Sequence, residues 1–439
     1  MKKVILLIFA LFVTTTAFSQ GVLNLLGRSQ DFFKLLEDQK YTDAYGYLDS
    51  TFQAKVPEED LKKLWTQISE KLGKIETLDV ISSKTQGEFF VVTMEGKFTN
   101  DDQNFLLAFN KAEKIVGFFL QPKSTAATYV LPAYADTTLY KETEINVKTP
   151  GHTLVGMLTV PKKLSSYPVV VLVHGSGPAD MDETVGPNKP LKDIALGLAS
   201  KGIASIRYVK RTMIYAGEFG KAFTVKEEVM DDALAAIALA KTLPAVNKKQ
   251  IYLLGHSLGG MIAPRIATLA PDLNGIIMLA APARKFTDLL VEQNKYMFGL
   301  SKDTSAAGKK TLDTVIKELE VTRITKLGTM KADSVLLGLP ASYWVDINVN
   351  DQVAAAKKLA KQRIFVGQGG NDFQVSTTDY NLWNTAIGKK KGAMVKLYPE
   401  LNHLLSPQTE KGSMEQYRTP VSVSDVLITD IATWIKAKP

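Results

Sequence analysis

The chain has 439 residues, a formal net charge of +8 and no cysteine, and 45% of its residues are hydrophobic. This composition is that of a globular protein with two or three domains, and it excludes a disordered or fibrous chain. The lack of cysteine excludes disulfides, thiolate metal sites and a cysteine nucleophile.

The first residues predict a secretory signal peptide over 1–19. Two lysines precede an apolar run from Val4 to Val13, and Ala17 and Ser19 stand where small residues precede a cleavage site. The run is shorter than the roughly 20 residues that a membrane span needs. We therefore expect an exported protein, periplasmic or secreted, with no stable membrane insertion after cleavage. An uncleaved N-terminal anchor is the alternative.

Residues 20–125 predict a small α+β domain. Apolar residues at helical spacing over 32–48 and an amphipathic stretch over 57–73 precede alternating strand patterns over 89–120. This part resembles the NTF2-like domain of unknown function that precedes some secreted hydrolases. The resemblance implies a packing or interaction module without chemistry of its own. Residues 126–139 are expected to be an extended linker.

Residues 140–439 predict a mostly parallel sheet with helices on both faces, because strand and helix patterns alternate along the chain. The apolar run "YPVVVLV" at residues 167–173 is typical of a strand buried on both faces. Residues 284–360 interrupt the alternation with helical patterns and are too long for a connecting loop. We expect them to form a helical cap over the carboxyl edge of the sheet, where open α/β folds bind ligands.

Ser257 lies in the motif Gly255-x-Ser257-x-Gly259, between a buried strand pattern and a helix. A nucleophilic serine can occupy such a sharp turn, and the flanking glycines let strand and helix approach closely. So short a motif also occurs by chance. It predicts a nucleophile only if a base, an acid and an oxyanion hole accompany it.

The base is sought among only four histidines. His152 lies on an early antiparallel strand pair, His174 ends a buried strand, and His256 is expected to point away from its neighbour Ser257. His403 follows the last clear strand, where a histidine comes after serine and acid in chain order. We therefore predict His403 as the base; the alternative is a solvent-facing loop histidine.

The carboxylate that would orient His403 is predicted to be Asp372, in "GGND" after a buried strand. The preceding Gly369 and Gly370 are expected to make this turn flexible. Asp346 is the runner-up, but it lies in the expected cap.

Two backbone N–H groups are expected to stabilise the oxyanion that forms during acyl transfer. Leu258, directly after the serine, supplies one. The loop "VHGSGP" after an earlier strand is expected to supply the other, from Ser176 first and Gly175 next. His174 is expected to brace this loop.

The motifs that carry a family resemblance are "HGSGPADMD" (174–182), "GHSLGG" (255–260), "GGND" (369–372) and "NH" (402–403). They are similar to those of the α/β-hydrolase superfamily. With the preceding domain, the chain resembles the two-domain secreted serine esterases of bacteria, whose hydrolase part is close to the dienelactone-hydrolase-like and prolyl-oligopeptidase-like families. The resemblance covers nearly the whole mature chain and implies a Ser257–Asp372–His403 triad.

One segment departs from the family pattern. Relatives tend to carry "RYDKRG" after the fourth strand, whereas residues 207–213 read "RYVKRTM". Val209 and Thr212 replace the acid and the glycine. Because this loop borders the expected site, the resemblance implies the chemistry more safely than the substrate preference.

These features predict a serine hydrolase that cleaves carboxylic esters through an acyl-enzyme, with no cofactor and no metal ion. A serine peptidase or amidase with the same triad and a non-catalytic binding protein of the same fold stay open as alternatives. The expected partner is a small-molecule ester, and a homo-oligomer is compatible with the sequence.

Nucleic acid is not expected, because the basic run "GKKKG" at 388–392 lacks aromatics and resembles a solvated turn. The cap aromatics are expected either to line an apolar pocket or to be ordinary core: Tyr296, Phe298, Tyr343 and Trp344.

Overall fold

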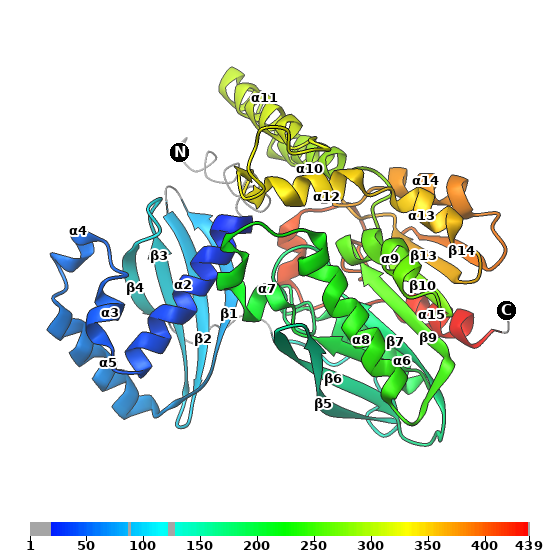
Figure 1. Cartoon of the computed structure of the whole chain (residues 1–439), viewed down its shortest axis with the longest axis horizontal. Coiled ribbons are helices and arrows are strands. Elements are labelled where there is room, and N and C mark those ends of the chain that lie inside the picture. Colours follow the sequence, from blue (N-terminus) through cyan, green and yellow to red (C-terminus); the bar gives the residue numbers. More distant parts are fainter. Residues whose placement is uncertain (1–18, 87–88, 122–127, 438–439) are drawn as a thin grey trace.

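The computed structural model of the chain describes residues 19–86, 89–121 and 128–437. A smaller N-terminal unit lies beside a larger C-terminal unit (Figure 1). Residues 1–18 of the expected signal peptide lie outside the described residues, so the signal peptide and the export it implies stay predictions. In the part of the chain that is described, no helix is long and apolar enough to cross a membrane.

The N-terminal unit places its helices before an antiparallel sheet of order β1-β2-β3-β4, as the α+β prediction requires. Its elements are α2 (Ser19–Glu37), α3 (Tyr41–Tyr45), α4 (Ser50–Gln53), α5 (Glu58–Leu72), β1 (Ile75–Gln86), β2 (Phe89–Phe98), β3 (Asp102–Phe109) and β4 (Ile115–Gln121). Acidic residues fill the first turn of α5, where they favour the positive helix end, and Gly73 with φ of 86° follows its last residue.

Aromatic rings fill the space between α2, α5 and the sheet. Phe33 of α2 lies 4.9 Å from Phe105 of β3 and 5.8 Å from Trp65 of α5, measured between ring centroids. Phe32 lies 5.6 Å from Phe118 of β4. Edge-to-face and tilted ring pairs at these distances are favourable packing contacts, so the centre of this unit is a well-filled core.

The C-terminal unit contains a mixed, mostly parallel sheet of order β14-β13-β10-β9-β7-β8-β6-β5. Strand β6 pairs antiparallel with both of its neighbours, β5 and β8, and all other neighbouring strands of this sheet are parallel. The sheet strands are β5 (Tyr140–Thr149), β6 (His152–Pro161), β7 (Tyr167–Val173), β8 (Ala204–Tyr208), β9 (Val246–His256), β10 (Gly275–Leu279), β13 (Arg363–Gly369) and β14 (Ala393–Tyr398). This topology confirms the predicted α/β-hydrolase fold.

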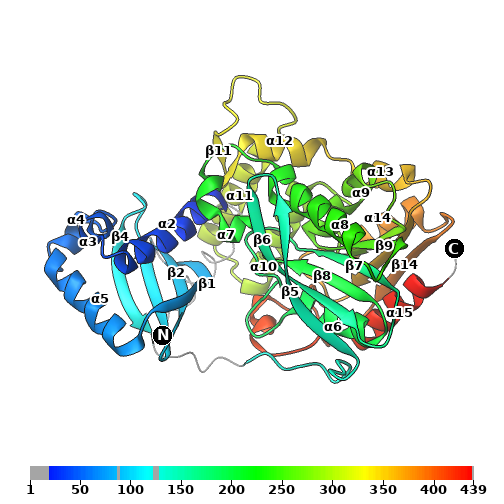
Figure 2. The ribbon, with the colours of Figure 1, turned by 60° about the horizontal axis from the view of Figure 1, so that its bottom comes forward.

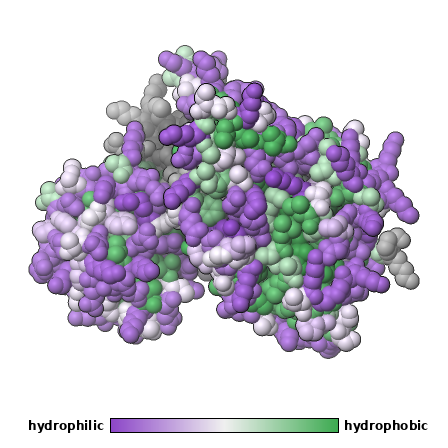
Figure 3. Space-filling model, viewed as in Figure 1, coloured by the Kyte–Doolittle hydropathy of each residue, from purple (hydrophilic) through white to green (hydrophobic). Residues whose placement is uncertain are grey.

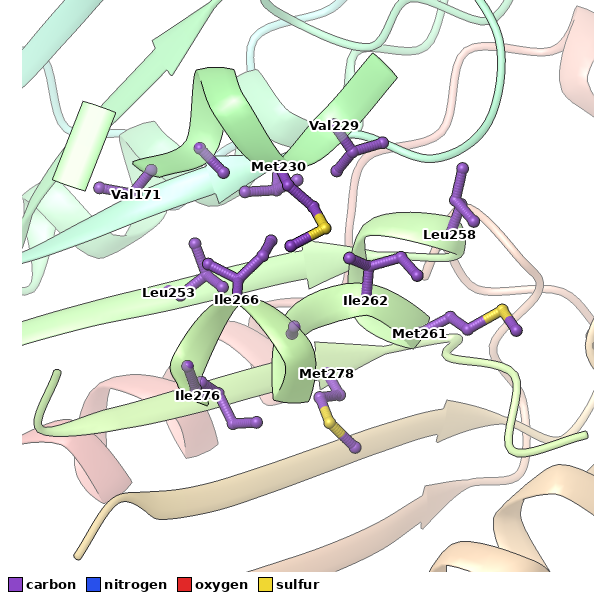
Figure 4. Packing of buried hydrophobic residues seen from close by; sticks show 14 of the residues in the cluster. Val171, Val229, Met230, Leu253, Leu258, Met261, Ile262, Ile266, Ile276 and Met278 are labelled. Carbon is purple, nitrogen blue, oxygen red and sulfur yellow. The ribbon is translucent and has the colours of Figure 1, made fainter. Parts of the chain in front are cut away.

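Helices cover both faces of this sheet (Figures 1 and 2). The flanking helices are α6 (Pro190–Ser200), α7 (Arg211–Ile214), α8 (Asp231–Thr242), α9 (Leu258–Leu269), α13 (Gln352–Lys358), α14 (Thr377–Ile387) and α15 (Asp425–Lys436), with short turns η2 (Ala216–Gly220), η3 (Lys226–Met230) and η4 (Met414–Arg418). The run at 167–173 is buried on both faces, as predicted: Val171 packs in the core under α8 and α9, and Val170 and Leu172 pack in the core under α6 and α15. Figure 4 shows the first of these cores, where Ile262 and Ile266 of α9 face the sheet.

The segment expected as a cap contains α10 (Phe286–Ser301), α11 (Ala306–Val321), the small hairpin β11 (Val335–Leu336) and β12 (Leu339–Pro340), and α12 (Ala341–Val349). These elements lie above the rest of the C-terminal unit in Figure 1. The expected segment also included α13, but α13 packs against α9 and α14. We therefore assign residues 352–358 to the helical layer of the sheet.

The two units meet where α2 packs against η2 and also contacts α7 and β12 (Figure 2). The backbones approach closely, because a Cβ atom added to Gly27 of α2 would lie 3.0 Å from the amide nitrogen of Gly217. Ala216 of η2 belongs to the core of the N-terminal unit. The contact is therefore a packed interface.

A π-helical turn, η3, leads directly into α8. Such a turn is a local widening of an α-helix and occurs frequently at functional sites. In this protein it carries Glu228, whose side chain is buried.

Candidate active site

Ser257 lies on the turn between β9 and α9, with φ of 51° and ψ of −116°. This conformation is unusual for a residue with a Cβ and costs roughly 1–3 kcal/mol, so the surroundings must hold it. The Ser257 amide donates to the carbonyl oxygen of Leu279 at 2.9 Å. A Cβ on Gly259 would lie 2.5 Å from the carbonyl oxygen of His174, which explains why the first turn of α9 has glycine at this position.

Asp372 and His403 form a buried pair, with 2.8 Å between Asp372 Oδ2 and His403 Nδ1. The other carboxylate oxygen, Oδ1, accepts from the backbone amides of Gln374 and Val375 at 2.7 and 2.8 Å. An acceptor at Nδ1 places the ring proton on that nitrogen, which leaves the Nε2 lone pair of His403 available as a base.

The turn that carries Asp372 packs closely against the turn that carries His403. Gly370 donates to the carbonyl oxygen of Tyr398 at 2.8 Å, and a Cβ on Gly369 would clash with the carbonyl group of Leu401. The glycine pair therefore allows a close approach of two backbones, and flexibility is not needed to explain it.

Asp346, the alternative acid, is not brought to His403. It lies on α12, and its Oδ1 accepts from Arg265 Nη1 of α9 at 2.8 Å. The structure therefore pairs Asp372, and not Asp346, with the predicted base.

His256 is closer to the site than its expected outward orientation implied. Its ring centroid lies 4.9 Å from that of His403, and its Nε2 lies 2.9 Å from the His403 carbonyl oxygen. Its Nδ1 lies 2.9 Å from Glu183 Oε2. Since both neighbours are acceptors, both ring nitrogens donate and the ring is an imidazolium. It thereby connects the strand end before Ser257 to the turn of His403.

The pKa values of this pair agree with that assignment. Burial lowers the pKa of His256, but the Glu183 carboxylate outweighs it and the net pKa is raised above 6.5. Burial raises the pKa of Glu183, but the charge and hydrogen bond of His256 bring it down to about 2. Both shifts favour the charged form of the residue concerned, the imidazolium of His256 and the carboxylate of Glu183.

Ser257 Oγ makes no hydrogen bond to any residue within the described ranges. In free enzymes the contact between nucleophile and base is often long and tightens when substrate binds. The contact between Ser257 and His403 stays a prediction.

The other histidines have different surroundings. His174 is buried edge-to-face on Tyr208, and burial lowers its pKa to about 4, so it is neutral. His152 Nε2 lies 2.7 Å from Glu218 Oε2 of η2, next to the N-terminal unit. Neither is paired with Asp372.

The expected oxyanion loop, residues 174–177, lies against the nucleophile. A Cβ on Gly175 would be 3.2 Å from Ser257 Cβ. The Gly175 amide, the second expected oxyanion donor, already donates to Glu183 Oε1 at 2.5 Å in this structure. The Ser176 amide has no acceptor among the residues described, and Leu258 begins α9, where the first amides of a helix lack partners.

Three buried charged residues around this loop were missed in the sequence: Glu183, Lys210 and Glu228. Lys210 Nζ donates to the carbonyl oxygens of Gly175 and Gly177 at 2.7 and 2.8 Å. One of them, Lys210, could have been noticed in the sequence. It matches the family pattern "RYDKRG", although Val209 and Thr212 on either side of it differ from that pattern.

Tyr343 and Trp344 of the cap are fully buried core residues, so they do not line an open pocket. The Tyr343 hydroxyl donates to Glu228 Oε2 at 2.7 Å. Tyr296 of α10 instead stacks on Phe373, the neighbour of Asp372, with 5.9 Å between ring centroids. A cap aromatic therefore lies near the acid, and two others stabilise the cap itself.

Two surface hollows lie away from these residues. One, of about 310 Å³, lies between η3, α8 and α9, in a region where apolar residues gather on the surface (Figure 3). The other, of about 660 Å³, lies in the N-terminal unit beside Tyr41 and Trp65. Neither is lined by Ser257, Asp372 or His403.

A sheet of this order, with a strained serine after β9 and a buried Asp–His pair after β13, defines an α/β-hydrolase. Residues 216–410 match the family described as "Serine aminopeptidase, S33", and residues 29–118 match "Protein of unknown function (DUF3887)". Esterase EstD of Thermotoga maritima is 31% identical over 404 residues, which are 92% of this chain and 93% of that protein. The chain belongs to the α/β-hydrolase family that includes Esterase EstD.

Solved structures with similar folds include an esterase domain from Rhodothermus marinus, with 14% identity, a TM-score of 0.41 and coverage of 67% of this chain and 99% of that one. The acylaminoacyl peptidase of Pyrococcus horikoshii has 13% identity, a TM-score of 0.42 and coverage of 75% of this chain and 47% of that one.

Proposed function

We propose that the protein is a serine esterase that cleaves carboxylic esters through an acyl-enzyme on Ser257. The observation that carries the proposal is the buried Asp372–His403 pair, which leaves Nε2 of His403 as a proton acceptor. The contact of His256, the neighbour of the strained Ser257, with the His403 carbonyl oxygen supports a common site. The name of the relative, Esterase EstD, favours an ester as substrate.

In this mechanism His403 Nε2 takes the proton of Ser257 Oγ as the oxygen attacks the ester carbonyl carbon. The Asp372 carboxylate stabilises the imidazolium that forms. The amides of Leu258 and Ser176 donate to the oxyanion, each worth ~2.7–4 kcal/mol of transition-state stabilisation. His403 then protonates the departing alcohol, and water, activated by the same ring, releases the acid.

A peptidase with the same triad is the second candidate, because residues 216–410 match a family described as a serine aminopeptidase. Recognition of a substrate amine would need a carboxylate that is free to pair with it. Glu183 and Glu228 lie beside the oxyanion loop, but each is already paired, with His256 and Lys210 respectively. This pairing favours an ester over an N-terminal amine substrate.

Fluorophosphonate labelling tests the nucleophile. We expect the wild-type protein to be labelled at Ser257, as read by peptide mass spectrometry, and Ser257→Ala to lose both labelling and p-nitrophenyl ester turnover. Ester turnover that survives Ser257→Ala would contradict the mechanism. Faster turnover of aminoacyl p-nitroanilides than of p-nitrophenyl esters by the wild type would favour the peptidase.

A further inference from the structure

The oxyanion loop is held by two buried carboxylates that take alternate amides. Glu183 Oε1 accepts from Gly175, and Glu228 Oε1 accepts from Gly177 at 2.9 Å. The amide between them, that of Ser176, is left without an acceptor in the described part of the chain. The alternation therefore selects a single loop amide that can serve the oxyanion.

Lys210 fixes the same loop from its carbonyl side. Its Nζ lies 2.7 Å from Glu228 Oε1 and also donates to the carbonyl oxygens of Gly175 and Gly177. All three protons of the ammonium group are thereby used, although the side chain is buried. A buried cation with three acceptors fixes their mutual geometry, because any displacement leaves a charge-assisted hydrogen bond unmade.

Glu228 extends this network into the cap. Its second oxygen, Oε2, accepts from the hydroxyl of Tyr343 on α12. Burial raises the pKa of Glu228, but the charge of Lys210 and the hydrogen bonds of Lys210, Tyr343 and Gly177 lower it overall. The carboxylate is therefore charged, and it links a cap helix to the loop through two different oxygens.

We infer that Lys210, Glu228 and Tyr343 form a positioning device that holds residues 175–177 so that the Ser176 amide points at the oxyanion. The cap helix α12 is thereby coupled to transition-state stabilisation, because a change at Tyr343 reaches the loop through Glu228. This inference rests on the proposed function of Ser257. None of the three residues needs to touch the substrate.

Tyr343→Phe tests the device with a small change, since it removes one hydroxyl and keeps the ring. We expect kcat for a p-nitrophenyl ester to fall about 10-fold with KM nearly unchanged, because a whole oxyanion donor is worth about 10²–10³ in kcat and this donor is only misplaced. The affinity for a boronic acid, which forms a tetrahedral adduct on the serine, should fall by a similar factor. Glu228→Gln should lower both further.

The chain offers a matched control on the opposite edge of the sheet. The Tyr398 hydroxyl donates to Asp430 Oδ2 at 2.8 Å, and Lys396 Nζ contacts the same carboxylate oxygen. Tyr398→Phe therefore also removes a tyrosine hydroxyl from a lysine–carboxylate pair, which here is partly exposed, whereas the Lys210–Glu228 pair is buried. We expect it to lower Tm slightly and to leave kcat and boronic acid affinity unchanged.

The inference is overturned if Tyr343→Phe behaves like Tyr398→Phe, with a lower Tm alone. It is also overturned if KM rises while kcat and boronic acid affinity are kept. Fluorophosphonate labelling of the wild type separates failure of this inference from failure of the proposed function. If Ser257 is labelled but Tyr343→Phe changes neither kcat nor boronic acid affinity, only the positioning device is refuted. If Ser257 is not labelled, the proposed function is refuted as well.

Discussion

At the residue scale, the two candidate acids differ in what each carboxylate contacts. Asp372 accepts from His403, whereas Asp346 pairs with Arg265. Asp372→Asn keeps the shape but stabilises the wrong ring tautomer, so kcat should fall by up to ~10⁴ in steady-state ester hydrolysis. Asp346→Asn is the matched control and should keep kcat within about twofold, since partly exposed ion pairs are worth only ~1 kcal/mol of stability. A larger loss in Asp346→Asn would reverse the assignment.

The pair of Glu183 and His256 predicts a pH dependence of stability. The folded pKa of His256 lies above 6.5, so its contribution is complete below pH 6.5 and is lost as pH rises through the folded value. The folded pKa of Glu183 lies near 2, so its contribution is complete above pH 4.5 and is lost as pH falls toward 2.

Glu183→Gln keeps an acceptor for Gly175 and removes the charge that pairs with His256. We expect it to lower the free energy of unfolding by about 3 kcal/mol near pH 5.5, the size typical of a broken buried pair. The loss should be smaller near pH 9, as measured by urea unfolding at both values. An equal loss at both pH values would show that the imidazolium is not the partner.

The sequence could predict the pairing of Asp372 with His403, because their order and their positions after strands are local patterns. It could not predict Glu183 or Lys210. Glu183 meets His256 across 73 residues, and Lys210 meets Gly175 across 35. Such pairings depend on which distant segments the fold places in contact. From sequence alone, an acid or a lysine in a loop is predicted to be exposed to solvent.

At the element scale, strand and helix alternation was sufficient to predict the parallel sheet, because central strands such as β7 and β10 are continuous apolar runs bounded by turns. The cap boundary was harder. α13 has a helical pattern like α10–α12, and only its contacts with α9 and α14 show that it belongs to the sheet layer. The π-helical turn η3 was also missed, since the run over 224–243 reads as one helix.

At the scale of the whole molecule, the N-terminal unit contacts both segments that flank the positioning device. Helix α2 packs against α7 and η2, which follow Lys210, and contacts β12, which leads into the helix of Tyr343. The family match for this unit is one of unknown function, and its core is filled with rings. These contacts favour a role of the N-terminal unit in supporting the hydrolase unit.

Gly27→Leu tests this docking. A side chain at Gly27 has no room against Gly217, while leucine favours the helical conformation of α2 itself. We expect the two units to separate, with a larger radius of gyration in small-angle X-ray scattering and two unfolding transitions in calorimetry. Gly217→Ala is the control, because a Cβ there meets nothing within 4 Å. An unchanged radius in Gly27→Leu would refute the packed interface.

The π-helical turn has a consequence for insertions and deletions in this family. A π turn holds one residue more than the α-helical turn it replaces, and each residue advances an α-helix by about 100°. Shortening 226–230 by one residue would leave α8 intact but rotate Glu228 relative to Gly177 and Tyr343. The length of the segment before α8 thus determines whether Glu228 reaches the loop. A relative that lacks this one residue would have to hold its oxyanion loop by other contacts.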